Sequence, residues 1–383
     1  MDFGFTEAQE LLRASVRRML DRVATPEYVR AADAQARYPY ELYDAFVEMG
    51  LIAMVFPEEY GGLGGNAMDV AIISEELGRT SYDFLCGYST CVFNGLNLLH
   101  HGSEAQKRHF LPKLMNGEVR MSIAMTEPDA GSDAGAMRAT ARREGNDWVL
   151  NGQKVFSSAS GAKNNVISVY AKTDTSVPYK NGISLFLVDN TLPGLQLKKL
   201  DTLGRRSIGT YEIFFDDVRV PGDCLVGEAD RGWSYMLAGL QLERLMTTAG
   251  YSGAAQSALD QAATYARQRS QFGRPIGDFQ AIAHMLADMQ TEVEASRLLM
   301  LHAAWQLAQG QDALRTLTMA KLMGSETYVK VANNGMQILG GYGYMNEFDM
   351  QRHFRESRST TIAAGTSQMQ RNIIAKFMGL NPK

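Results

Sequence analysis

The spacing of apolar residues changes twice along this chain of 383 residues, and this change constrains the fold more than any other feature. From Thr6 to about residue 118, apolar residues recur every three or four positions, as in Tyr40–Met49, which indicates amphipathic helices. The pattern then alternates and becomes rich in β-branched and aromatic residues, which indicates strands, until helical spacing returns after Gly227. We therefore predict an α+β protein with an N-terminal all-α domain at 1–118, a β domain at 119–227 and a C-terminal helical bundle at 228–383.

Four runs in the predicted β domain have the composition of strands: Asp147–Leu150, Asn165–Tyr170, Gly182–Val188 and Thr210–Phe215. Asn151–Gly152 follows the first run and precedes Val155–Phe156. Such a pair is typical of a two-residue hairpin turn, because both central positions need positive φ. We predict a small antiparallel barrel or sandwich.

The terminal domains carry helix signals of two kinds. Thr6 and Gln9 form a capping-box pattern, which predicts a helix from there to about residue 20. The C-terminal domain has long helical patterns joined by short loops, which favours an up-and-down four-helix bundle. These patterns lie near 229–268, 279–308, 313–338 and 366–379.

Composition excludes several classes of protein. The net charge is −4 and no basic run with interleaved aromatic residues occurs, so we expect no nucleic-acid partner. Cys86, Cys91 and Cys224 form no CxxC pair and have no histidines at metal-ligand spacing, so we expect no metal site. The longest apolar run, Gly50–Phe56, is too short to insert into a membrane, and the first residues do not resemble a secretory signal. We expect a cytoplasmic protein, or a processed organelle-matrix form.

Glu243 is a lone carboxylate in an otherwise apolar helical stripe. The stripe consists of Met236, Leu240, Glu243, Met246 and Gly250. Apolar surroundings raise the pKa of a carboxyl group toward neutrality, which would make Glu243 a candidate general base. The alternative is an ordinary ion pair with a charged residue of another helix. The residue alone favours the ion pair.

Two further motifs could bind a ligand. In Ile123–Asp133, Pro128 and Gly131 predict a tight turn whose hydroxyl and backbone N–H groups could hold a polar heterocycle or a phosphate. A solvent-exposed loop would have the same composition. In Arg267–Gln280, Arg269 is expected at a helix end, where it could meet an anionic diphosphate or simply complement the helix dipole.

Two motifs follow in the C-terminal domain. The glycines of Gln337–Tyr344 come after a predicted helix and would allow a flat ligand to approach the backbone. No strand precedes them, so we reject a dinucleotide-binding fingerprint. In Ile362–Arg371, Thr366 or Ser367 can cap the last helix, a role that requires no ligand.

In this order on an α–β–α chain, the four motifs resemble the acyl-CoA dehydrogenase family over essentially the full length. The matching blocks are Thr126–Asp133, Arg269–Gln280, Gly340–Tyr344 and Gly365–Gln368. The resemblance implies that the protein binds FAD non-covalently and oxidises an acyl-CoA thioester to the trans-2-enoyl-CoA. It also implies a homotetramer that passes electrons to an electron-transfer flavoprotein.

By the family pattern, FAD would contact both the β domain and the C-terminal domain. The β-domain residues are Ile123, Met125, Thr126, Ser132, Phe156, Ser157 and Ser158. The C-terminal residues are Arg269, Phe272, Gln280, Gln337, Gly340, Gly341, Thr366, Ser367 and Gln368. Of these, Arg269, Gln280 and the segment 337–341 would hold the diphosphate and adenine across a subunit interface.

The family pattern also changes the interpretation of Glu243. Many members carry the catalytic glutamate immediately before the Gly-Thr of the last motif, where this chain has Ala364. Isovaleryl-CoA and long-chain acyl-CoA dehydrogenases take it instead from a Leu-Glu-Arg-Leu sequence, which is Leu242–Leu245 here. We therefore expect Glu243 to remove the α-proton while the backbone N–H of Ala364 donates to the thioester carbonyl. A small residue at Ala364 leads us to expect tolerance of branched or bulky acyl groups.

Ser132, Gln241, Arg244, Ala364 and Gly365 are the expected substrate contacts. Gln241 stands where the family commonly has an aspartate that contacts CoA, so either a neutral amide makes that contact or the carrier differs from CoA. Arg244 follows the family pattern and favours CoA. The alternatives are an acyl-CoA oxidase or enoyl-CoA reductase on the same fold, and a non-catalytic flavin or acyl-CoA binding protein.

Overall fold

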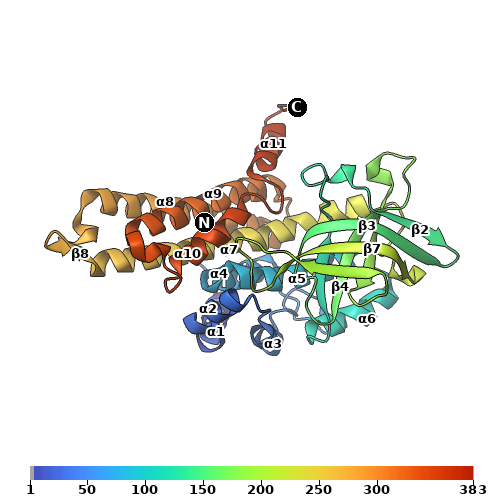
Figure 1. Cartoon of the computed structure of the whole chain (residues 1–383), viewed down its shortest axis with the longest axis horizontal. Helices are drawn as coiled ribbons and strands as arrows, with labels where there is room; N and C mark the ends of the chain where they lie inside the picture. Colours follow the sequence, from blue (N-terminus) through green and yellow to red (C-terminus); the bar gives the residue numbers. More distant parts are fainter. Residues whose placement is uncertain (1–3, 383) are drawn as a thin grey trace. The chain divides into compact units, whose positions relative to one another are not determined.

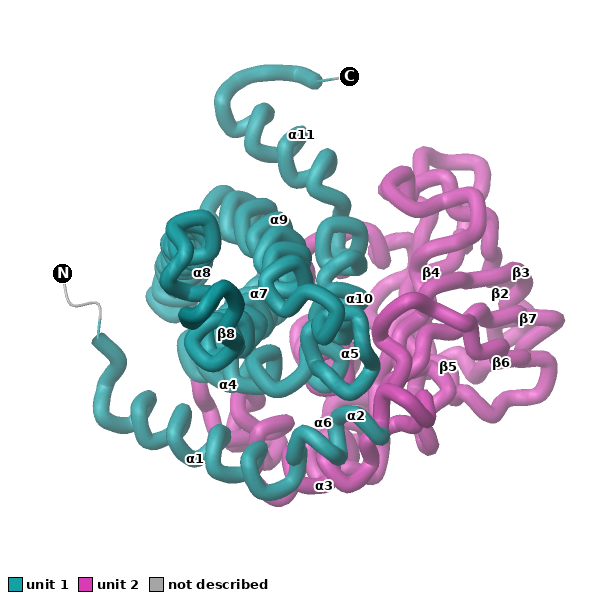
Figure 2. Tube along the Cα trace, turned by 60° about the vertical axis from the view of Figure 1, so that its left-hand side comes forward, with its two compact units in different colours: residues 1–31, 66–85, 244–383 teal, residues 32–65, 86–243 magenta. Residues whose placement is uncertain are grey.

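The computed structural model describes residues 4–382, which form two compact units (Figure 2). Unit 1 comprises residues 1–31, 66–85 and 244–383, and unit 2 comprises residues 32–65 and 86–243. Helical segments at both ends and a strand-rich middle make the chain a mixed α+β protein (Figure 1). The two units cut across the three domains expected from the sequence, so those boundaries stay a prediction.

Unit 1 is built from helices. They are α1 (Glu7–Val23), α2 (Pro26–Gln35, which runs on into unit 2), α4 (Ala67–Thr80), the later part of α7 (Gly232–Gln268), α8 (Gln280–Ala308), α9 (Leu314–Leu339), α10 (Met350–Thr360) and α11 (Ser367–Phe377). The capping box at Thr6 is present, with the Gln9 N–H donating to the Thr6 hydroxyl at 3.3 Å. Helix α9 packs against α8, α10 and α11, so it is the centre of the C-terminal helices.

Helices α4 and α7 approach closely because glycines line their contact. A Cβ atom at Gly78 would lie 2.3 Å from the Gly250 carbonyl oxygen, and one at Gly253 would lie 1.9 Å from the Glu75 carbonyl oxygen. Neither distance leaves room for a side chain. Charged pairs flank this contact, since Glu75 binds Arg297 of α8 at 2.6 Å and Glu76 binds Arg17 of α1 at 2.6 Å.

Unit 2 combines helices with one seven-stranded sheet. The helices are α3 (Tyr40–Glu48), α5 (Tyr82–His101, which begins in unit 1), α6 (Glu104–Met115) and the start of α7. The strands are β1 (Arg120–Ala124), β2 (Thr140–Glu144), β3 (Asp147–Ser158), β4 (Asn165–Lys172), β5 (Ile183–Asp189), β6 (Leu195–Lys199) and β7 (Thr210–Val220). Their order is β1-β4-β2-β3-β7-β6, and β5 pairs with β4.

The expectation of a purely antiparallel sheet was wrong. Strand β4 runs parallel to β1 and, through one residue pair, to β2, whereas the remaining pairs are antiparallel. The hairpin of β2 and β3 separates β1 from β4 in the sequence, and a connection of that length permits parallel pairing.

The predicted hairpin at Asn151–Gly152 was also wrong. Strand β3 continues through both residues, and the two-residue turn is Gly145–Asn146, between the paired Glu144 and Asp147. Asn151 lies opposite an irregularity in β7, where its side chain accepts the Asp217 N–H at 3.0 Å. Gly152 is needed for space, because a Cβ there would lie 2.7 Å from the Ala139 Cα.

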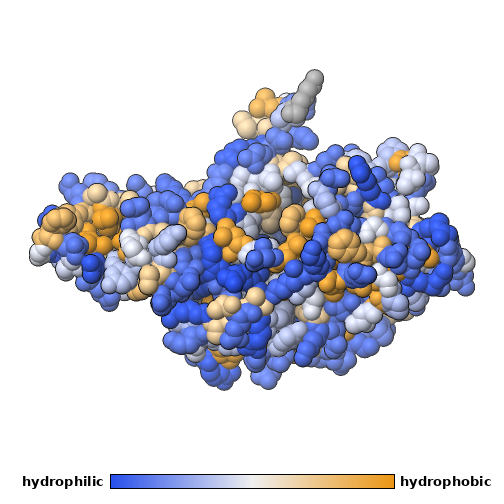
Figure 3. All heavy atoms as spheres, viewed as in Figure 1, coloured by the Kyte–Doolittle hydropathy of each residue, from blue (hydrophilic) through white to orange (hydrophobic). Residues whose placement is uncertain are grey.

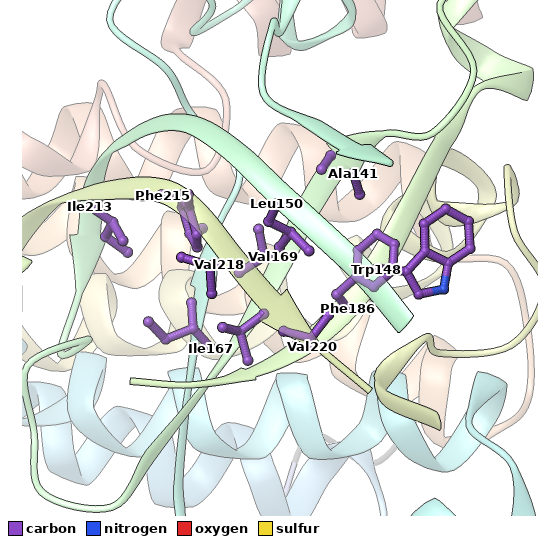
Figure 4. Packing of buried hydrophobic residues seen from close by; sticks show 13 residues of the cluster. Ala141, Trp148, Leu150, Ile167, Val169, Phe186, Ile213, Phe215, Val218 and Val220 are labelled. Atoms are coloured by element: carbon purple, nitrogen blue, oxygen red, sulfur yellow. The ribbon is translucent and has the colours of Figure 1, made fainter. Parts of the chain in front are cut away.

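The core of unit 2 comes from alternate residues of the sheet. Trp148, Ile167, Phe186 and Val218 are among the side chains that meet there (Figure 4). The rings of Trp148 and Phe186 pack edge to face at 5.4 Å. This core fixes β3, whose far end carries residues that the sequence assigned to the site.

Residues 4–382 contain no helix whose length and apolarity would let it cross a lipid bilayer. The same residues bring no three His, Cys, Asp or Glu side chains together in a way that could hold a metal ion.

Candidate active site

The Ile123–Asp133 motif begins in β1 and turns back at once. Glu127 and Ala130 form an antiparallel bridge in which each N–H donates to the other's carbonyl at 3.1 Å. The Thr126 carbonyl accepts the Val155 N–H at 2.8 Å, which ties the motif to β3. The Thr126 side chain is half-buried and that of Ser132 is exposed. The predicted tight turn is therefore present, and it leaves two hydroxyl groups accessible.

A buried ion pair between Lys154 and Glu127 holds this turn in place. Lys154 of β3 is 0% exposed, and its Nζ donates to Glu127 Oε1 at 2.8 Å and to the Met125 carbonyl at 3.1 Å. The same carboxylate accepts the Ala139 N–H at 2.9 Å. Glu127 therefore shapes the loop and does not face a ligand. Lys154 was not predicted from the sequence, because an isolated lysine in a strand is usually exposed.

The environment keeps the Glu127 carboxylate ionised. Burial alone would raise its pKa, but Lys154 and the backbone N–H groups of Arg138 and Ala139 outweigh burial and lower the pKa. Burial also lowers the pKa of Lys154, and Glu127 opposes that change. Each charge is thus acceptable inside the protein only while the other is present.

Phe156 has an unusual backbone and an unusual exposure. Its φ is +60°, it lies in a bulge of β3 opposite β7, and 65% of the residue is exposed. A positive φ is costly for an aromatic residue, and such strain concentrates at functional sites. Phe156 therefore exposes an aromatic ring close to the Thr126 turn, because the preceding residue, Val155, is hydrogen-bonded to the Thr126 carbonyl.

Ser157 and Ser158 point to different partners. The Ser157 hydroxyl donates to the Ile123 carbonyl and lies 2.5 Å from the Ser160 hydroxyl, so it ties β3 to β1. The Ser158 hydroxyl accepts from Nη1 of Arg205 at 3.3 Å. A guanidinium can only donate, so the Ser158 proton remains available for another acceptor.

Glu243 lies in the fourth turn of α7 and is half-buried. Met236 is 8% exposed and Met246 is 0% exposed, so the stripe predicted around Glu243 is largely buried. Tyr170 of β4 lies close enough for the Glu243 charge to affect its pKa. Burial raises the pKa of Tyr170, a hydrogen bond from Asn97 lowers it, and the negative charge of Glu243 raises it further.

The residues next to Glu243 differ in burial. Gln241 is half-buried, and among the described residues its Oε1 has no hydrogen-bond partner. Arg244 is 7% exposed and belongs to unit 1, whereas Glu243 belongs to unit 2. Gln241 is thus a predicted substrate contact whose buried acceptor is unpaired.

In unit 1 the structure brings two predicted segments together. Arg269 follows directly after α7, and its guanidinium lies 5.9 Å from the ring centre of Tyr342, in the segment Gly340–Tyr344. Phe272 lies at the turn between β8 (Ser270–Gln271) and β9 (Arg274–Pro275) and is 95% exposed. Gln280 and Gln337 are also exposed. Apolar surface is visible at this β8 end of unit 1 (Figure 3).

The last motif forms a turn that hydrogen bonds keep in place. Ala364 and Gly365 have φ values of +53° and +83°, and Thr366 caps α11 by accepting the Met369 N–H at 3.2 Å. Nζ of the fully buried Lys321 donates to the Gly365 carbonyl at 2.6 Å. Ser367 is buried and Gln368 is exposed. The cap at Thr366 is therefore confirmed, and Lys321 is a second buried lysine that was not predicted from the sequence.

These segments fit a flavin dinucleotide in their chemistry. In unit 2, Phe156 offers an exposed ring beside the accessible hydroxyls of Thr126 and Ser132. In unit 1, Arg269 offers a cation near Gly340 and Gly341, where an added Cβ would meet nothing within 4 Å. Aromatic and hydroxyl groups suit a polar heterocycle, and a cation beside bare backbone suits a diphosphate.

Comparison with known proteins identifies the family. Residues 6–118, 122–218 and 230–379 match the N-terminal, middle and C-terminal domains of acyl-CoA dehydrogenase. The chain is 35% identical to a subunit of the caffeyl-CoA reductase–Etf complex of Acetobacterium woodii, over 98% of this chain and 99% of that protein. It is 37% identical to mitochondrial isovaleryl-CoA dehydrogenase of Oryza sativa subsp. japonica, over 97% and 91% of the two chains.

A solved structure of glutaryl-coenzyme A dehydrogenase with glutaryl-CoA superposes with a TM-score of 0.95 at 34% identity, covering 100% of this chain and 98% of that one. The match thus extends over the entire fold. The chain belongs to the acyl-CoA dehydrogenase family, and it is an FAD-dependent oxidoreductase.

Proposed function

We propose that this protein oxidises an acyl-CoA thioester to the trans-2-enoyl-CoA with Glu243 as the general base. The observation that carries the proposal is the half-buried Glu243 carboxylate in a largely buried stripe of α7. Its negative charge raises the pKa of the Tyr170 phenol. Family membership then favours the base over an ordinary ion pair. Ala364 occupies the alternative position of the base and carries no carboxylate.

Each residue has a separate role in the proposed reaction. Glu243 takes the α-proton onto its carboxylate. The backbone N–H of Ala364 donates to the thioester carbonyl, which stabilises the negative charge that develops there. Lys321 fixes the turn that carries this N–H by binding the next carbonyl, that of Gly365. When bound, FAD supplies the acceptor for the β-hydride.

The residues assigned to FAD fall in both units, and by the family pattern Arg269, Gln280 and the segment 337–341 would make their contacts across a subunit interface. In unit 2 we assign Ile123, Met125, Thr126, Ser132, Phe156, Ser157 and Ser158 to the flavin and its ribityl chain. In unit 1 we assign the diphosphate and adenine to Arg269, Phe272, Gln280, Gln337, Gly340 and Gly341, and a further contact to Thr366, Ser367 and Gln368. The exposed Phe156 and Phe272 support this assignment, because large exposed aromatic residues commonly mark binding surfaces.

We assign Gln241 and Arg244 to the CoA part of the substrate. The unpaired Oε1 acceptor of Gln241 supports a neutral amide contact in place of the usual aspartate. The small side chain of Ala364 supports tolerance of branched or bulky acyl groups. Rates of flavin reduction on straight, branched and cyclic acyl-CoAs test this preference, and a clear preference for short straight chains would contradict it.

The test of Glu243 is anaerobic bleaching of bound FAD by acyl-CoA. We expect Glu243→Gln to retain FAD but to bleach 10²- to 10⁴-fold more slowly, or not measurably, because a positioned base contributes about that factor. The exposed Glu228, which precedes α7, supplies the control: Glu228→Gln should bleach at the wild-type rate. A wild-type protein that no acyl-CoA bleaches would instead support a non-catalytic flavin or acyl-CoA binding protein.

We further propose that reduced protein passes its electrons to an electron-transfer flavoprotein. The relative from the caffeyl-CoA reductase–Etf complex supports this acceptor, and it also keeps the reductive direction as the second candidate. Reoxidation by air and by an electron-transfer flavoprotein, compared after bleaching, distinguishes an oxidase from a dehydrogenase. A homotetramer in the cytoplasm completes the proposal, and light scattering measures the number of subunits.

A further inference from the structure

Arg205 is a strained residue whose side chain contacts the end of β3. Its φ is +57°, a left-handed conformation that residues other than glycine seldom adopt. Such strain persists only where the surrounding structure enforces it, and it concentrates at functional sites. The side chain is half-buried, and its Nη1 donates to the Ser158 hydroxyl at 3.3 Å. The strained backbone therefore accompanies a contact with a residue that is assigned to the flavin.

The loop that carries Arg205 is anchored on both sides. Where it leaves β6, the Leu200 N–H donates to the Thr210 carbonyl at 2.8 Å. Where it enters β7, the Gly209 carbonyl accepts the N–H of Ala159, the first residue after β3, at 2.9 Å. The backbone around Arg205 is thus tied to β7 and to the end of β3, which holds the guanidinium close to its partner.

The contact leaves Ser158 with a proton to donate. A guanidinium has no acceptor, so the Ser158 oxygen must accept in this bond. Within residues 4–382, no acceptor takes the Ser158 proton. Ser158 is 8% exposed, so little of it reaches bulk water. The residue is therefore a donor with an acceptor still to find, and an acceptor atom of the flavin would complete it.

The Arg205 charge lies close to any group that Ser158 binds. A second hydrogen bond of about 3 Å beyond Ser158 would place that group within about 7 Å of Nη1. A neutral flavin that takes up a hydride gains one negative charge. At an effective dielectric constant of about 20, a unit charge about 10 Å away shifts such an equilibrium roughly tenfold. The guanidinium thus favours the reduced flavin over the oxidised one.

We infer that Arg205 is a positioning residue that directs the Ser158 hydroxyl toward the flavin and raises the reduction potential of the flavin. Ser158 meets the flavin only under the proposed function, so the inference rests on that function. The effect concerns the cofactor alone and is measurable without acyl-CoA.

The test is the midpoint potential of bound FAD, measured anaerobically by equilibration with a reference dye. For Arg205→Met we expect the ratio of reduced to oxidised flavin at a fixed potential to fall about tenfold, which is about 30 mV for a two-electron couple. Arg205→Lys keeps the positive charge and should recover part of that ratio. Ser158→Ala removes the acceptor of the Arg205 bond, and in this background Arg205→Met should have a smaller effect.

The potential separates this role from a structural one. A residue that only shapes the loop would weaken the binding of oxidised and reduced FAD alike, so its loss would leave the potential unchanged. Arg206→Met is the matched control, because it removes the same charge from the next residue of the loop, which is also half-buried. Its ratio of reduced to oxidised flavin should stay within about twofold of the wild type.

Two results would overturn the inference. If Arg205→Met shifts the potential no more than Arg206→Met, Arg205 is a structural residue only. If Ser158→Ala and Arg205→Met both leave the absorbance and the potential of the flavin unchanged, Ser158 does not meet the flavin and its assignment fails as well. Bleaching of the wild type by acyl-CoA is a separate measurement, so failure of the proposed reaction is distinguishable from both results.

Discussion

At the scale of single residues, the Glu127–Lys154 pair is the feature on which the turn of the Ile123–Asp133 motif depends. Both side chains are buried, and removal of one partner leaves an uncompensated charge inside the protein. We expect Lys154→Met to lower the free energy of unfolding by about 3–5 kcal/mol. Urea unfolding of the FAD-free protein measures the loss without a contribution from the cofactor.

The double variant Lys154→Met with Glu127→Gln removes both charges and should recover part of that stability. The exposed pair Arg138–Asp129 in the same loop is the control, with side chains 80% and 77% exposed. Asp129→Asn should change the free energy of unfolding by less than about 1 kcal/mol, because exposed pairs contribute little. If Lys154→Met and Asp129→Asn lowered the free energy of unfolding equally, burial would not determine how much an ion pair contributes to stability.

The site residues assigned from the family resemblance stay a prediction, but the structure shows how exposed they are. Phe156 is exposed and Thr126 is half-buried, whereas Glu127 next to Thr126 is a buried loop anchor. Lys154 and Lys321 were not predicted, because their partners are a distant carboxylate and a backbone carbonyl. Pairings over such sequence separations are set by the fold and leave no local pattern.

At the scale of elements, the contact of α4 with α7 depends on glycine. We expect Gly253→Ala to lower the free energy of unfolding by about 3 kcal/mol, because its Cβ would lie 1.9 Å from the Glu75 carbonyl oxygen and the helices would have to separate. Gly324→Ala in α9 is the matched control. Its Cβ would meet Thr248 at 3.5 Å, an ordinary contact, so helix propensity should stabilise it by up to about 1 kcal/mol.

Thermal and urea unfolding of both variants give the comparison. A Gly253→Ala protein as stable as the Gly324→Ala protein would contradict the packing argument, since both substitutions improve helix propensity equally.

Elements with apolar faces were predictable, and elements defined by polar contacts were not. The predicted helices near 229–268, 279–308, 313–338 and 366–379 correspond to α7, α8, α9 and α11. Helix α10 was missed because its buried face includes Arg352, His353, Glu356 and Ser357, which hides the helical spacing of apolar residues. The Asn151–Gly152 pair led to a wrong prediction of a hairpin turn, because the same residue types also occur at irregularities within a strand.

At the scale of the whole molecule, the order helix, strand, helix followed from the spacing of apolar residues alone. The parallel pairing of β1 with β4 did not, because strand order depends on contacts between segments about 45 residues apart, such as Arg120 with Asn165. The expected FAD residues fall in both units. Only the family pattern connected them, since no local property relates Thr126 to Arg269.

The pH dependence of stability is a further property of the whole molecule, and His353 dominates one part of it. His353 is 1% exposed, with Nδ1 3.0 Å from the Tyr328 hydroxyl and Nε2 3.2 Å from Nε2 of Gln261. The Gln261 amide nitrogen can only donate, so Nε2 must stay unprotonated. Burial, with the positive charge of Arg352, lowers the pKa of His353 to about 3, and Asp349 opposes this only weakly.

The unfolded chain therefore binds a proton at His353 below pH 6.5, whereas the folded protein does not until about pH 3. Stability from this residue is complete above pH 6.5 and falls as the pH decreases. At 1.36 kcal/mol per pH unit, the loss between pH 6.5 and 4.5 is about 2–3 kcal/mol. The carboxylates with lowered pKa, such as Glu127, lose their contribution only at lower pH.

Urea unfolding at pH 7 and pH 4.5 measures this loss. We expect His353→Gln to remove about 2–3 kcal/mol of the pH dependence, although it also lowers stability at pH 7. His101 acts in the same direction, because its pKa is also lowered, so the difference between the wild type and His353→Gln isolates His353. The exposed His284 serves as control, and His284→Gln should keep the wild-type pH dependence. If His353→Gln lost as much stability as the wild type between the two pH values, acid sensitivity in this range would have to come from groups other than the buried imidazole.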